Sequence, residues 1–257
     1  MDLPYFDLTD KVAIISGGAT GIGRGIAEGL AEAGANVGIL GRRLEVCEQA
    51  CLEIEEKCGV SAFPFCCDIT NSREVRDVVE KIVKSCGHID ILVNNAGIGG
   101  SEKKIVEMTE EDWDNVLNIN LKAVFILTKA VITKMLEQGK GGKIINVASI
   151  GALIGIPNMS AYCASKGGCL QLTKVMALEW VRHNIQVNAI LPGYFETPMN
   201  TKFFSSDAGQ KVIKDDIPMK RLAQIEEIKG VAILLASHAS DFITGSSMAI
   251  DGGRACC

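Results

Sequence analysis

The sequence lacks the cysteine and histidine spacings that build metal sites. It has ten cysteines but no Cys-x-x-Cys pair, and its three histidines lie far from the cysteines in the chain. Zinc and similar ions need clustered nitrogen and sulfur ligands, so we expect no metal site. Several cysteines fall at apolar positions of helical or strand patterns, which predicts buried, reduced thiols rather than disulfides. Free thiols are typical of a reducing compartment, so the sequence predicts a cytoplasmic protein.

A strong positive charge is also absent. The net charge is −5 and no basic stripe stands out, which argues against a nucleic-acid partner. Residues 1–10 contain three acids and no base, so they do not resemble a secretory signal. Residues 144–165 carry no charge, but Asn146, Pro157 and Ser160 interrupt them, and a lipid-facing helix rarely tolerates these together. We therefore expect no membrane segment.

Short apolar runs alternate with helical patterns along the whole chain, and no repeat, linker or low-complexity stretch divides them. The clearest helix is Ser72–Cys86, where apolar residues recur along one face. This alternation predicts an α/β fold: a single Rossmann-type doubly wound domain over residues 1–257, with about seven parallel strands and helices on both faces. In such sheets ligands bind beyond the carboxyl ends of the strands. The expected strands cover residues 12–16, 36–40, 62–66, 89–93, 143–147, 185–191 and 247–250.

A glycine-rich segment follows the first expected strand. It reads Gly17-Gly18-Ala19-Thr20-Gly21-Ile22-Gly23 and leads into a helix. Glycines allow the backbone to turn tightly and approach a pyrophosphate, and the helix N-terminus supplies free N–H groups. The spacing differs from the G-x-G-x-x-G dinucleotide motif, so a glycine turn without a ligand is the alternative interpretation of this segment alone.

Tyr162 and Lys166 form a second candidate site. They are four residues apart in a helical pattern, so their side chains share one face. A lysine cation stabilises a phenolate, so we expect Lys166 to lower the pKa of Tyr162 from about 10 toward working pH. Such a tyrosine can exchange a proton with a hydroxyl or carbonyl oxygen. Taken alone, the pair is better described as a packed tyrosine beside a solvated lysine.

Together, the glycine loop and the Tyr-x-x-x-Lys pair resemble the short-chain dehydrogenase/reductase family. The match covers about residues 11–253 and is similar to gluconate 5-dehydrogenase-like and 3-oxoacyl carrier-protein reductase-like members. Further segments match the family's motifs in order: Asn94-Asn95-Ala96-Gly97, Asn118-Ile119-Asn120-Leu121, Ser149 ahead of Tyr162, Pro192-Gly193 with Thr197, and Asp251-Gly252-Gly253.

The resemblance implies roles for four catalytic residues. Tyr162 acts as general acid in reduction and as general base in oxidation, and Ser149 hydrogen-bonds the substrate oxygen. Lys166 tunes Tyr162 and binds the nicotinamide ribose, and Asn120 anchors a water that links Lys166 to solvent. The implied cofactor-binding residues are Gly17, Thr20, Gly21, Ile22, Gly23, Arg42, Arg43, Asp68, Ile69, Asn95, Ala96, Gly97, Tyr162, Lys166, Pro192, Gly193 and Thr197.

The end of the second expected strand bears on the choice of cofactor. NAD sites usually place an acid there, whereas this sequence has Gly41 followed by Arg42 and Arg43. Cations at a helix N-terminus oppose the helix dipole, which favours an anion nearby, and a ribose 2′-phosphate fits. We therefore expect NADP(H), with NAD(H) less favoured. Two solvated arginines are the alternative.

These residues predict an NAD(P)(H)-dependent oxidoreductase that interconverts a secondary alcohol and a ketone, on a small polyol or sugar acid. The alternatives are a 3-oxoacyl reductase, a reductase of an apolar ketone, or a non-catalytic dinucleotide-binding sensor or scaffold. Residues 194–220 are expected to form the substrate loop. Helical residues 113–136 and 161–181 have apolar residues on more than one side, which, with the resemblance, implies a homotetramer.

Overall fold

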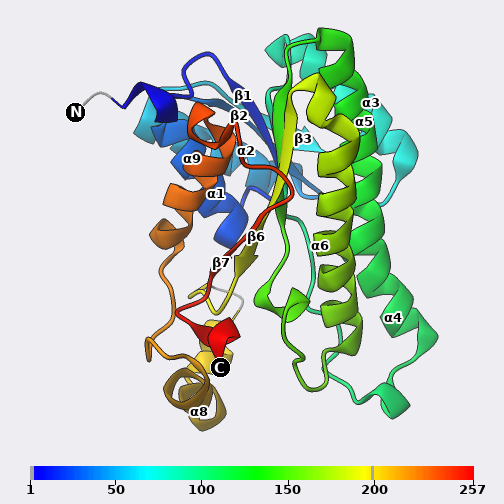
Figure 1. The fold of residues 1–257 in the computed structure, drawn as a ribbon, viewed down its shortest axis with the longest axis vertical. Helices are drawn as coiled ribbons and strands as arrows, with labels where there is room; N and C mark the ends of the chain where they lie inside the picture. The colour runs from blue at the N-terminus through cyan, green and yellow to red at the C-terminus, as the bar shows by residue number, and fades with distance from the viewer. Residues whose placement is uncertain (1–2, 198–199) are drawn as a thin grey trace.

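A parallel sheet forms the centre of the molecule (Figure 1). The computed structural model describes residues 3–197 and 200–257, so Pro198 and Met199 of the expected substrate loop lie outside the described residues. The sheet has seven strands in the order β3-β2-β1-β4-β5-β6-β7, and every strand pair is parallel. The predicted fold class is confirmed. The strands are β1 Val12–Ser16, β2 Asn36–Gly41, β3 Ala62–Cys66, β4 Ile91–Asn94, β5 Gly142–Val147, β6 Ile185–Pro192 and β7 Ser247–Ile250.

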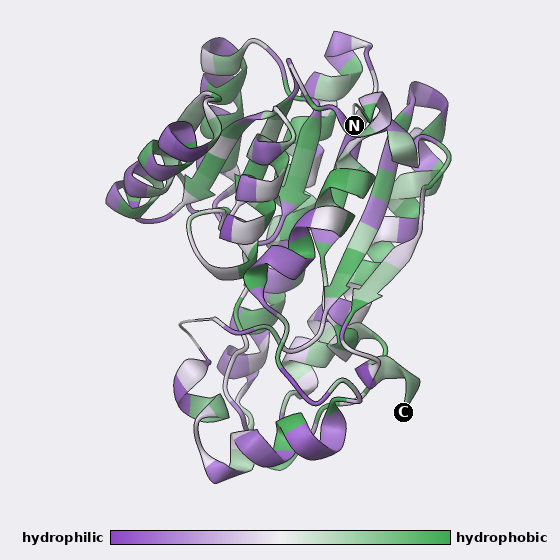
Figure 2. Ribbon diagram, turned by 90° about the vertical axis from the view of Figure 1, so that its left-hand side faces the viewer, coloured by the Kyte–Doolittle hydropathy of each residue, from purple (hydrophilic) through white to green (hydrophobic). Residues whose placement is uncertain are grey.

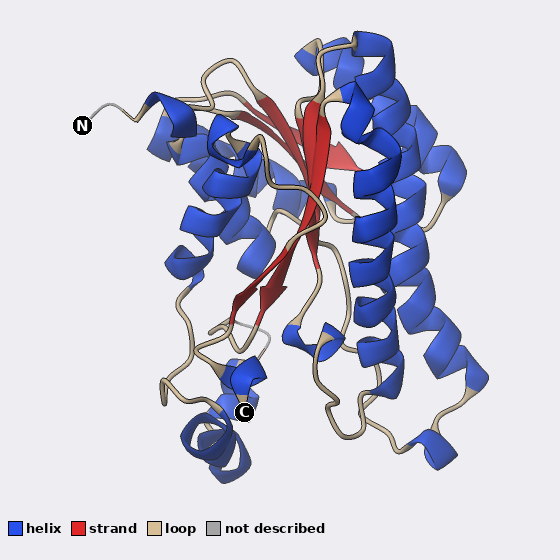
Figure 3. Cartoon of the chain, viewed as in Figure 1, coloured by secondary structure: helices blue, strands red, loops and turns tan. Residues whose placement is uncertain are grey.

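Helices cover both faces of the sheet (Figure 3). One face carries α1 Gly21–Glu32, α2 Leu44–Cys58 and α9 Lys229–Ala236. The other carries α3 Ser72–Cys86, α5 Ala123–Gln138 and α6 Ser160–Trp180, with α4 Glu110–Leu117 beside α6. Two short helices, α7 Thr201–Phe204 and α8 Asp207–Asp216, follow β6 in the chain. Figure 2 shows hydrophobic strands enclosed by helices that alternate hydrophobic and hydrophilic residues.

The strand β1 shows why the sheet needs both layers. All five of its residues are buried. Because side chains alternate across a strand, Ala13 and Ile15 pack with α1, whereas Val12 and Ile14 pack with α3. A strand buried on both faces reads as a continuous apolar run, as this one does.

The strand β4 begins two residues later than the sequence predicts and ends at Asn94. Ile89 belongs to the apolar run that suggested the strand, and it is fully buried. Its backbone instead bonds the side-chain amide of Gln138, with its N–H donating to Oε1 at 3.0 Å and its carbonyl accepting from Nε2 at 2.9 Å. The first paired residue of β4 is therefore Ile91, opposite Ala13.

The helix α3 has the predicted bounds. Asn71 caps it by accepting hydrogen bonds from the N–H groups of Arg73 and Glu74. Its buried residues are Val75, Val78, Val79 and Ile82, which are the apolar stripe seen in the sequence.

A long helical run joins α4 and α5 through a π-helical segment, Asn118–Lys122. By length and composition alone, the run Glu110–Gln138 could cross a membrane, and 44% of its most apolar window is buried. Leu127 and Val131 of α5 pack with strand residues such as Leu92, so this part of the run is a core helix of the sheet. π-Helical segments inside α-helices frequently mark functional sites, and this one contains Asn120.

A buried polar network ties the strands to the helices on this face. Asn94 donates from Nδ2 to Thr128 Oγ1 and to Asn146 Oδ1, both at 2.8 Å. Asn146 donates in turn to Thr173 Oγ1 at 2.8 Å. All four residues are buried, so the network joins β4, β5, α5 and α6 where water cannot replace a lost partner.

All ten cysteines are free thiols. Four are buried, which are Cys47, Cys51, Cys67 and Cys169, while Cys66, Cys256 and Cys257 are exposed. Burial is the main cause that raises the pKa of Cys51 and of Cys67 to about 12, so these thiols stay protonated and behave as apolar side chains. Among the described residues, no group of His, Cys, Asp or Glu side chains could hold a metal ion.

Candidate active site

The glycine loop runs from the end of β1 into α1. Gly17 and Gly21 adopt positive φ angles of 65° and 54°, which favour glycine. A Cβ atom on Gly23 would overlap the carbonyl oxygen of Gly17 and the side chain of Asn95. Thr20 precedes α1 without capping it, so the first N–H groups of the helix receive no hydrogen bond from its side chain. The loop therefore has the close backbone approach and the free donors that bind phosphate.

Asn95 shapes this loop from the next strand, β4. Its Nδ2 donates to the carbonyl oxygens of Ser16 and Gly17, both at 3.1 Å. The hydroxyl of Ser16 accepts from the N–H groups of Asn95 at 3.0 Å and Ala96 at 3.2 Å. Asn95 and Ala96 thus hold the glycine loop in position. The side-chain amide group of Asn95 donates to backbone carbonyls of the protein.

Ser149 and Tyr162 meet beyond the carboxyl end of β5. Ser149 caps a short 3-10 helix, Ile150–Ala152, by accepting from the N–H of Gly151 at 3.1 Å. A Cβ atom on Gly151 would lie 3.3 Å from Cε1 of Tyr162, so the tyrosine ring packs closely on this turn. The Ser149 side chain lies close enough to Tyr162 to oppose part of the rise in the pKa of its phenol. This places a hydroxyl pair at the end of the sheet where ligands bind in parallel α/β folds.

Lys166 lies one turn of α6 beyond Tyr162 and is 5% exposed. Its Nζ donates to the carbonyl oxygen of Val147 at 2.9 Å and lies 5.8 Å from the centroid of the Tyr162 ring. Burial lowers the pKa of Lys166, because removal from water disfavours the charged form. The predicted sharing of one helix face is confirmed by these positions.

The expectation that the pKa of Tyr162 falls from about 10 toward working pH is wrong for this structure. Burial raises the pKa of Tyr162 and outweighs the opposing effect of Ser149. The sequence could show the spacing of the two residues but not the depth at which the fold places the phenol.

Asn120 completes the cluster from the π-helical segment. It is 1% exposed, and its amide both accepts from the N–H and donates to the carbonyl of Ile98, each at 2.8 Å. It also donates to Ser165 Oγ at 3.2 Å, and that hydroxyl donates to the carbonyl of Tyr162 at 2.7 Å. The wider turn of the π-helix thus ties Asn120 to the loop after β4 and to α6.

Gly97 lies between Asn120 and Lys166. A Cβ atom there would be 3.1 Å from Asn120 Oδ1 and 3.5 Å from Lys166 Nζ. The space that the two side chains share is therefore kept open by the absence of a side chain at this position.

The loop after β6 returns toward the glycine loop. Gly193 packs so closely on Asp251 that its Cβ atom would lie 2.7 Å from the Asp251 Cα. Thr197 approaches Gly21, whose Cβ position is 3.7 Å from Thr197 Cγ2. The predicted residues Pro192, Gly193 and Thr197 thus lead from the sheet to the N-terminus of α1.

Most of the remaining predicted cofactor residues lie beyond the carboxyl ends of β2 and β3. Arg42 and Arg43 follow β2, and Arg43 directly precedes α2. Hydrogen bonds from Thr70, and to a smaller extent the charge of Arg42, lower the pKa of Asp68, so Arg42 lies near this carboxylate. Ile22 and Ile69 instead pack against the hydrophobic core. The catalytic cluster and this basic end are separated by β1 and β4.

Two further residues lie beyond the last two strands: Tyr194, which the sequence assigned only to the substrate loop, and Arg254, which received no role. Tyr194 follows β6 and stacks edge-on against Phe204, with ring centroids 5.7 Å apart. Arg254 follows β7, and its Nε atom is buried. The only sequence signal for Arg254 is its position directly after Asp251-Gly252-Gly253, a turn that ends a strand.

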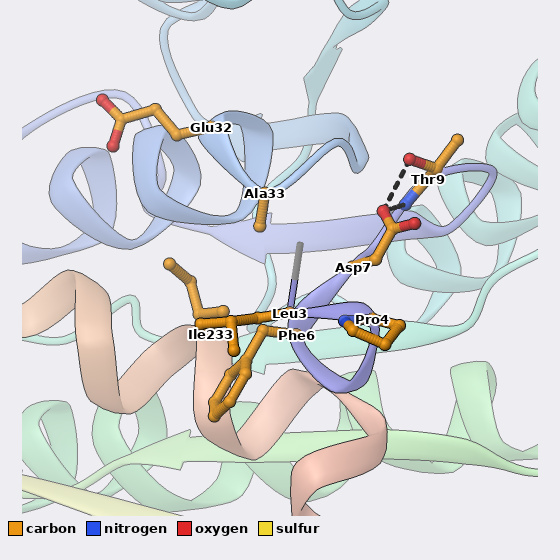
Figure 4. Close-up of a pocket in the computed structure, with 8 residues that line it drawn as sticks. All are labelled: Leu3, Pro4, Phe6, Asp7, Thr9, Glu32, Ala33 and Ile233. Atoms are coloured by element: carbon orange, nitrogen blue, oxygen red, sulfur yellow. Dashed lines mark hydrogen bonds between the residues drawn. The ribbon is translucent and has the colours of Figure 1, made fainter. Parts of the chain in front are cut away.

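A hollow lies at the opposite, amino end of the sheet (Figure 4). It has a volume of about 620 Å³ and is lined mainly by the segment before β1, the end of α1 and Ile233 of α9. Its carboxylate Asp7 accepts from the N–H of Thr9 at 2.9 Å and from its hydroxyl at 2.6 Å. The hollow lies far from the catalytic cluster and its acid serves a local turn.

The chain resembles known oxidoreductases along its length. A family model described as enoyl-(acyl carrier protein) reductase matches residues 17–255. The chain is 40% identical over 253 residues to a 2-dehydro-3-deoxy-D-gluconate 5-dehydrogenase of Dickeya dadantii, covering 98% of each. It is 39% identical over 246 residues to a 3-oxoacyl-(acyl-carrier-protein) reductase of Thermotoga maritima, covering 96% of this chain and 98% of that one.

Solved structures agree with these relatives. A crystal structure of a gluconate 5-dehydrogenase from Burkholderia cenocepacia J2315, in complex with NADP and tartrate, matches with a TM-score of 0.93 and 36% identity, covering 98% of each chain. The glycine loop of β1 and the Tyr162–Lys166 pair of α6 thus stand in a fold and a sequence shared with dehydrogenases and reductases. The chain is an oxidoreductase and belongs to the short-chain dehydrogenase/reductase family.

Proposed function

We propose that the enzyme interconverts a secondary alcohol and a ketone by hydride transfer, with NADP(H) as the redox cofactor. The observation that carries this proposal is the meeting of Ser149, Tyr162 and Lys166 beyond β5, in the same sheet edge as the glycine loop beyond β1. A proton-transfer group and a dinucleotide cradle are the two parts that such a reaction needs.

The glycine loop fits a dinucleotide. Side chains at Gly17 and Gly23 would fill the space that a pyrophosphate approaches, and the start of α1 offers N–H groups to it. Thr197 beside Gly21 would close the loop over the nicotinamide half. We assign the pyrophosphate to Gly17, Thr20, Gly21, Ile22 and Gly23, with Ile22 contributing its backbone because its side chain packs on the core.

The chemistry then falls to the chain's own side chains. The bound nicotinamide supplies or accepts the hydride. Ser149 hydrogen-bonds the substrate oxygen and orients it toward Tyr162. Tyr162 donates its phenolic proton to that oxygen in reduction and accepts a proton in oxidation. The Lys166 cation favours the phenolate that forms when Tyr162 gives up its proton. Asn120, held in place by its two hydrogen bonds to the Ile98 backbone, anchors a water that links Lys166 to solvent.

The basic end of β2 supports the choice of NADP(H). Gly41 stands where an acid would bind the ribose hydroxyl of NAD(H), and an added Cβ there would lie 2.8 Å from Cys47 Sγ. Arg42 and Arg43 are both exposed and free to meet an anion. An arginine can bind a phosphate with two charge-assisted hydrogen bonds.

We propose a small polyol or sugar acid as substrate, within a substrate loop formed by residues 194–220. Support comes from relatives named for gluconate derivatives and from a neighbour solved with tartrate, a small hydroxy acid. The 39% identity to a 3-oxoacyl-(acyl-carrier-protein) reductase supports the second candidate, a 3-oxoacyl reductase. The test follows NADPH absorbance with keto sugar acids, neutral ketoses and 3-oxoacyl thioesters. Turnover of the sugar acids at the highest kcat/KM is expected, and turnover of none of the three would contradict the proposal.

We also propose a homotetramer in a reducing, cytoplasmic setting. Apolar side chains stand exposed on α4, α5 and α6, including Phe125 at 48% and Leu178 at 80%. Such faces need a partner, and a second copy of this chain is the simplest one. Light scattering at micromolar concentration should give four times the chain mass, and a monomer would contradict this assembly.

A further inference from the structure

The ends of β6 and β7 bring two residues together that are far apart in sequence. The strands are paired in parallel up to Pro192 and Ile250, and the N–H of Gly193 donates to the carbonyl of Ile250 at 2.9 Å. Tyr194 lies directly after this pair on one strand, and Arg254 lies after it on the other. Both therefore lie at the carboxyl edge of the sheet, where Figure 1 shows the C-terminal segment close to α8.

A tight turn holds Arg254 in place. The carboxylate of Asp251 accepts from the N–H groups of Gly253 at 3.0 Å and Ala255 at 2.7 Å. Gly253 has a φ of 89°, and a Cβ atom there would lie 3.2 Å from Pro218. Asp251 thus uses both carboxylate oxygens within this turn, and Asp216 is a second carboxylate close enough to act on the pKa of Tyr194.

The guanidinium of Arg254 has an unused donor. Its Nε atom is buried and has no hydrogen-bond partner among residues 3–197 and 200–257. A buried donor without a partner costs free energy, because it has lost its bond to water. The edge of a guanidinium that includes Nε is one side of the fork that grips a carboxylate with two parallel bonds.

The position of Arg254 connects it to the catalytic tyrosine. Arg254 lies close to Tyr194, because its charge partly opposes the burial that raises the pKa of Tyr194. Ser149 and Tyr162 lie beyond the end of β5, which pairs with β6 as β6 pairs with β7. Tyr194 and Arg254 therefore lie at the same edge of the sheet as Tyr162, beyond the neighbouring strands.

We propose that Arg254, with Tyr194 beside it, binds the carboxylate of the substrate and makes the enzyme select hydroxy and keto acids over neutral polyols and ketones. This inference rests on the proposed function and names the residue that determines its substrate class. Phe204 packs edge-on against the Tyr194 ring and supplies an apolar surface, so the Arg254 cation orients a chain with a negative charge at one end.

The test compares gluconate with glucitol, the neutral polyol of equal length, in the oxidative direction with NADP⁺. We expect Arg254→Met to raise KM for gluconate by roughly tenfold or more, since hydrogen bonds to charged groups are among the strong ones. KM for glucitol and KM for NADP⁺ should stay unchanged. Arg254→Lys, which keeps the charge but loses the fork, should lie between. Inhibition by tartrate should weaken in the same order.

Arg182→Met is the matched control, because Arg182 is exposed at the amino edge of the sheet. Its kinetics should equal those of the unmodified enzyme. The role of Arg254 would be rejected if, with KM for NADP⁺ unchanged, Arg254→Met raised KM equally for gluconate and glucitol. An unchanged KM for gluconate would reject it too. Neither result would affect the proposed function. If the unmodified enzyme oxidised glucitol but no hydroxy acid, both the proposed substrate class and the role of Arg254 would be rejected. If Arg254→Met fails to fold, Arg254→Lys must still shift the gluconate-to-glucitol ratio, and an unshifted ratio rejects the proposal.

Discussion

The ammonium group of Lys166 donates a 2.9 Å hydrogen bond to the carbonyl oxygen of Val147. Val147 is the last residue of β5, and Ser149 follows two residues later. The bond therefore fixes the cation relative to the serine through the sheet itself. Because a neutral carbonyl rather than a carboxylate accepts this bond, the full positive charge of Lys166 remains available to a phenolate.

Replacing Tyr162 by Phe should abolish most turnover while the cofactor still binds. Only the hydroxyl is lost, and general acid–base catalysis contributes ~10²- to 10⁴-fold. We expect kcat to fall by that amount and the Kd for NADPH, measured by fluorescence titration, to stay the same. Tyr5→Phe, at a tyrosine that is 68% exposed before β1, is the control. A near-normal kcat in Tyr162→Phe would reject the assignment.

Replacing Lys166 by Met should inactivate the enzyme yet stabilise the cofactor-free protein. Burial lowers the pKa of Lys166 below its ordinary value of 10.5, so below 10.5 the unfolded chain binds more protons than the folded one. The contribution of Lys166 to the free energy of unfolding therefore rises with pH up to 10.5. It is lowest at low pH, where the lysine is charged while buried. Thermal unfolding from pH 7 to 10 should show a higher Tm for Lys166→Met at pH 7 and a smaller gain toward pH 10. A lower Tm at pH 7 would contradict this.

Replacing Arg42 by Ala should reduce the use of NADPH and scarcely change that of NADH. Two hydrogen bonds to the 2′-phosphate would be lost, and bonds to charged groups contribute about 1.5–3 kcal/mol. This corresponds to roughly tenfold or more in kcat/KM. Arg43 could take over part of the contact, so the double variant is the cleaner measurement. Equal losses with both cofactors, or equal kcat/KM for both in the unmodified enzyme, would contradict the preference for NADP(H).

Replacing Gly23 by Ala should prevent cofactor binding and destabilise the protein. The added methyl group would overlap the Gly17 carbonyl and the Asn95 amide, so the loop must move. Gly230→Ala is the matched control: it lies in α9, and its Cβ position has open space around it. Alanine there should be neutral or slightly stabilising, because it favours helix. Similar Kd values for NADPH in both variants would show that the loop tolerates the change.

Replacing Asn146 by Leu should cost about 1–3 kcal/mol of unfolding free energy without a direct effect on chemistry. The change leaves the amide of Asn94 without one acceptor and removes the donor to Thr173, both in the buried interior. Urea denaturation measures the loss, and Asn115→Ala on the exposed side of α4 should change stability little. Unchanged stability in Asn146→Leu would show that the network contributes only packing.

The sequence predicted the strands and helix α3 closely because their apolar residues follow the periods of strand and helix. Where burial and backbone pairing diverge, as at Ile89, the pattern misplaced the strand start. The spacing of Tyr162 and Lys166 could be seen in the sequence, whereas Asn120 and Ser149 were identified only through the resemblance to the family.

Properties that depend on distant packing could not be predicted. The raised pKa of Tyr162 reflects how deeply the fold buries the phenol, and no local pattern encodes that depth. Tyr194 and Arg254 are brought together by the register of β6 and β7, which the spacing along the chain does not reveal. Arg254 thus stayed outside the sequence analysis.

The bond between Asn95 and Ser16 has a consequence for biosynthesis. The glycine loop leaves the ribosome early, but the amide that shapes it follows 79 residues later. Domains fold as units during synthesis, and a nascent chain that ends within α3 has the loop without its clamp. A dinucleotide bound by this loop would therefore stabilise the chain only once β4 has joined β1.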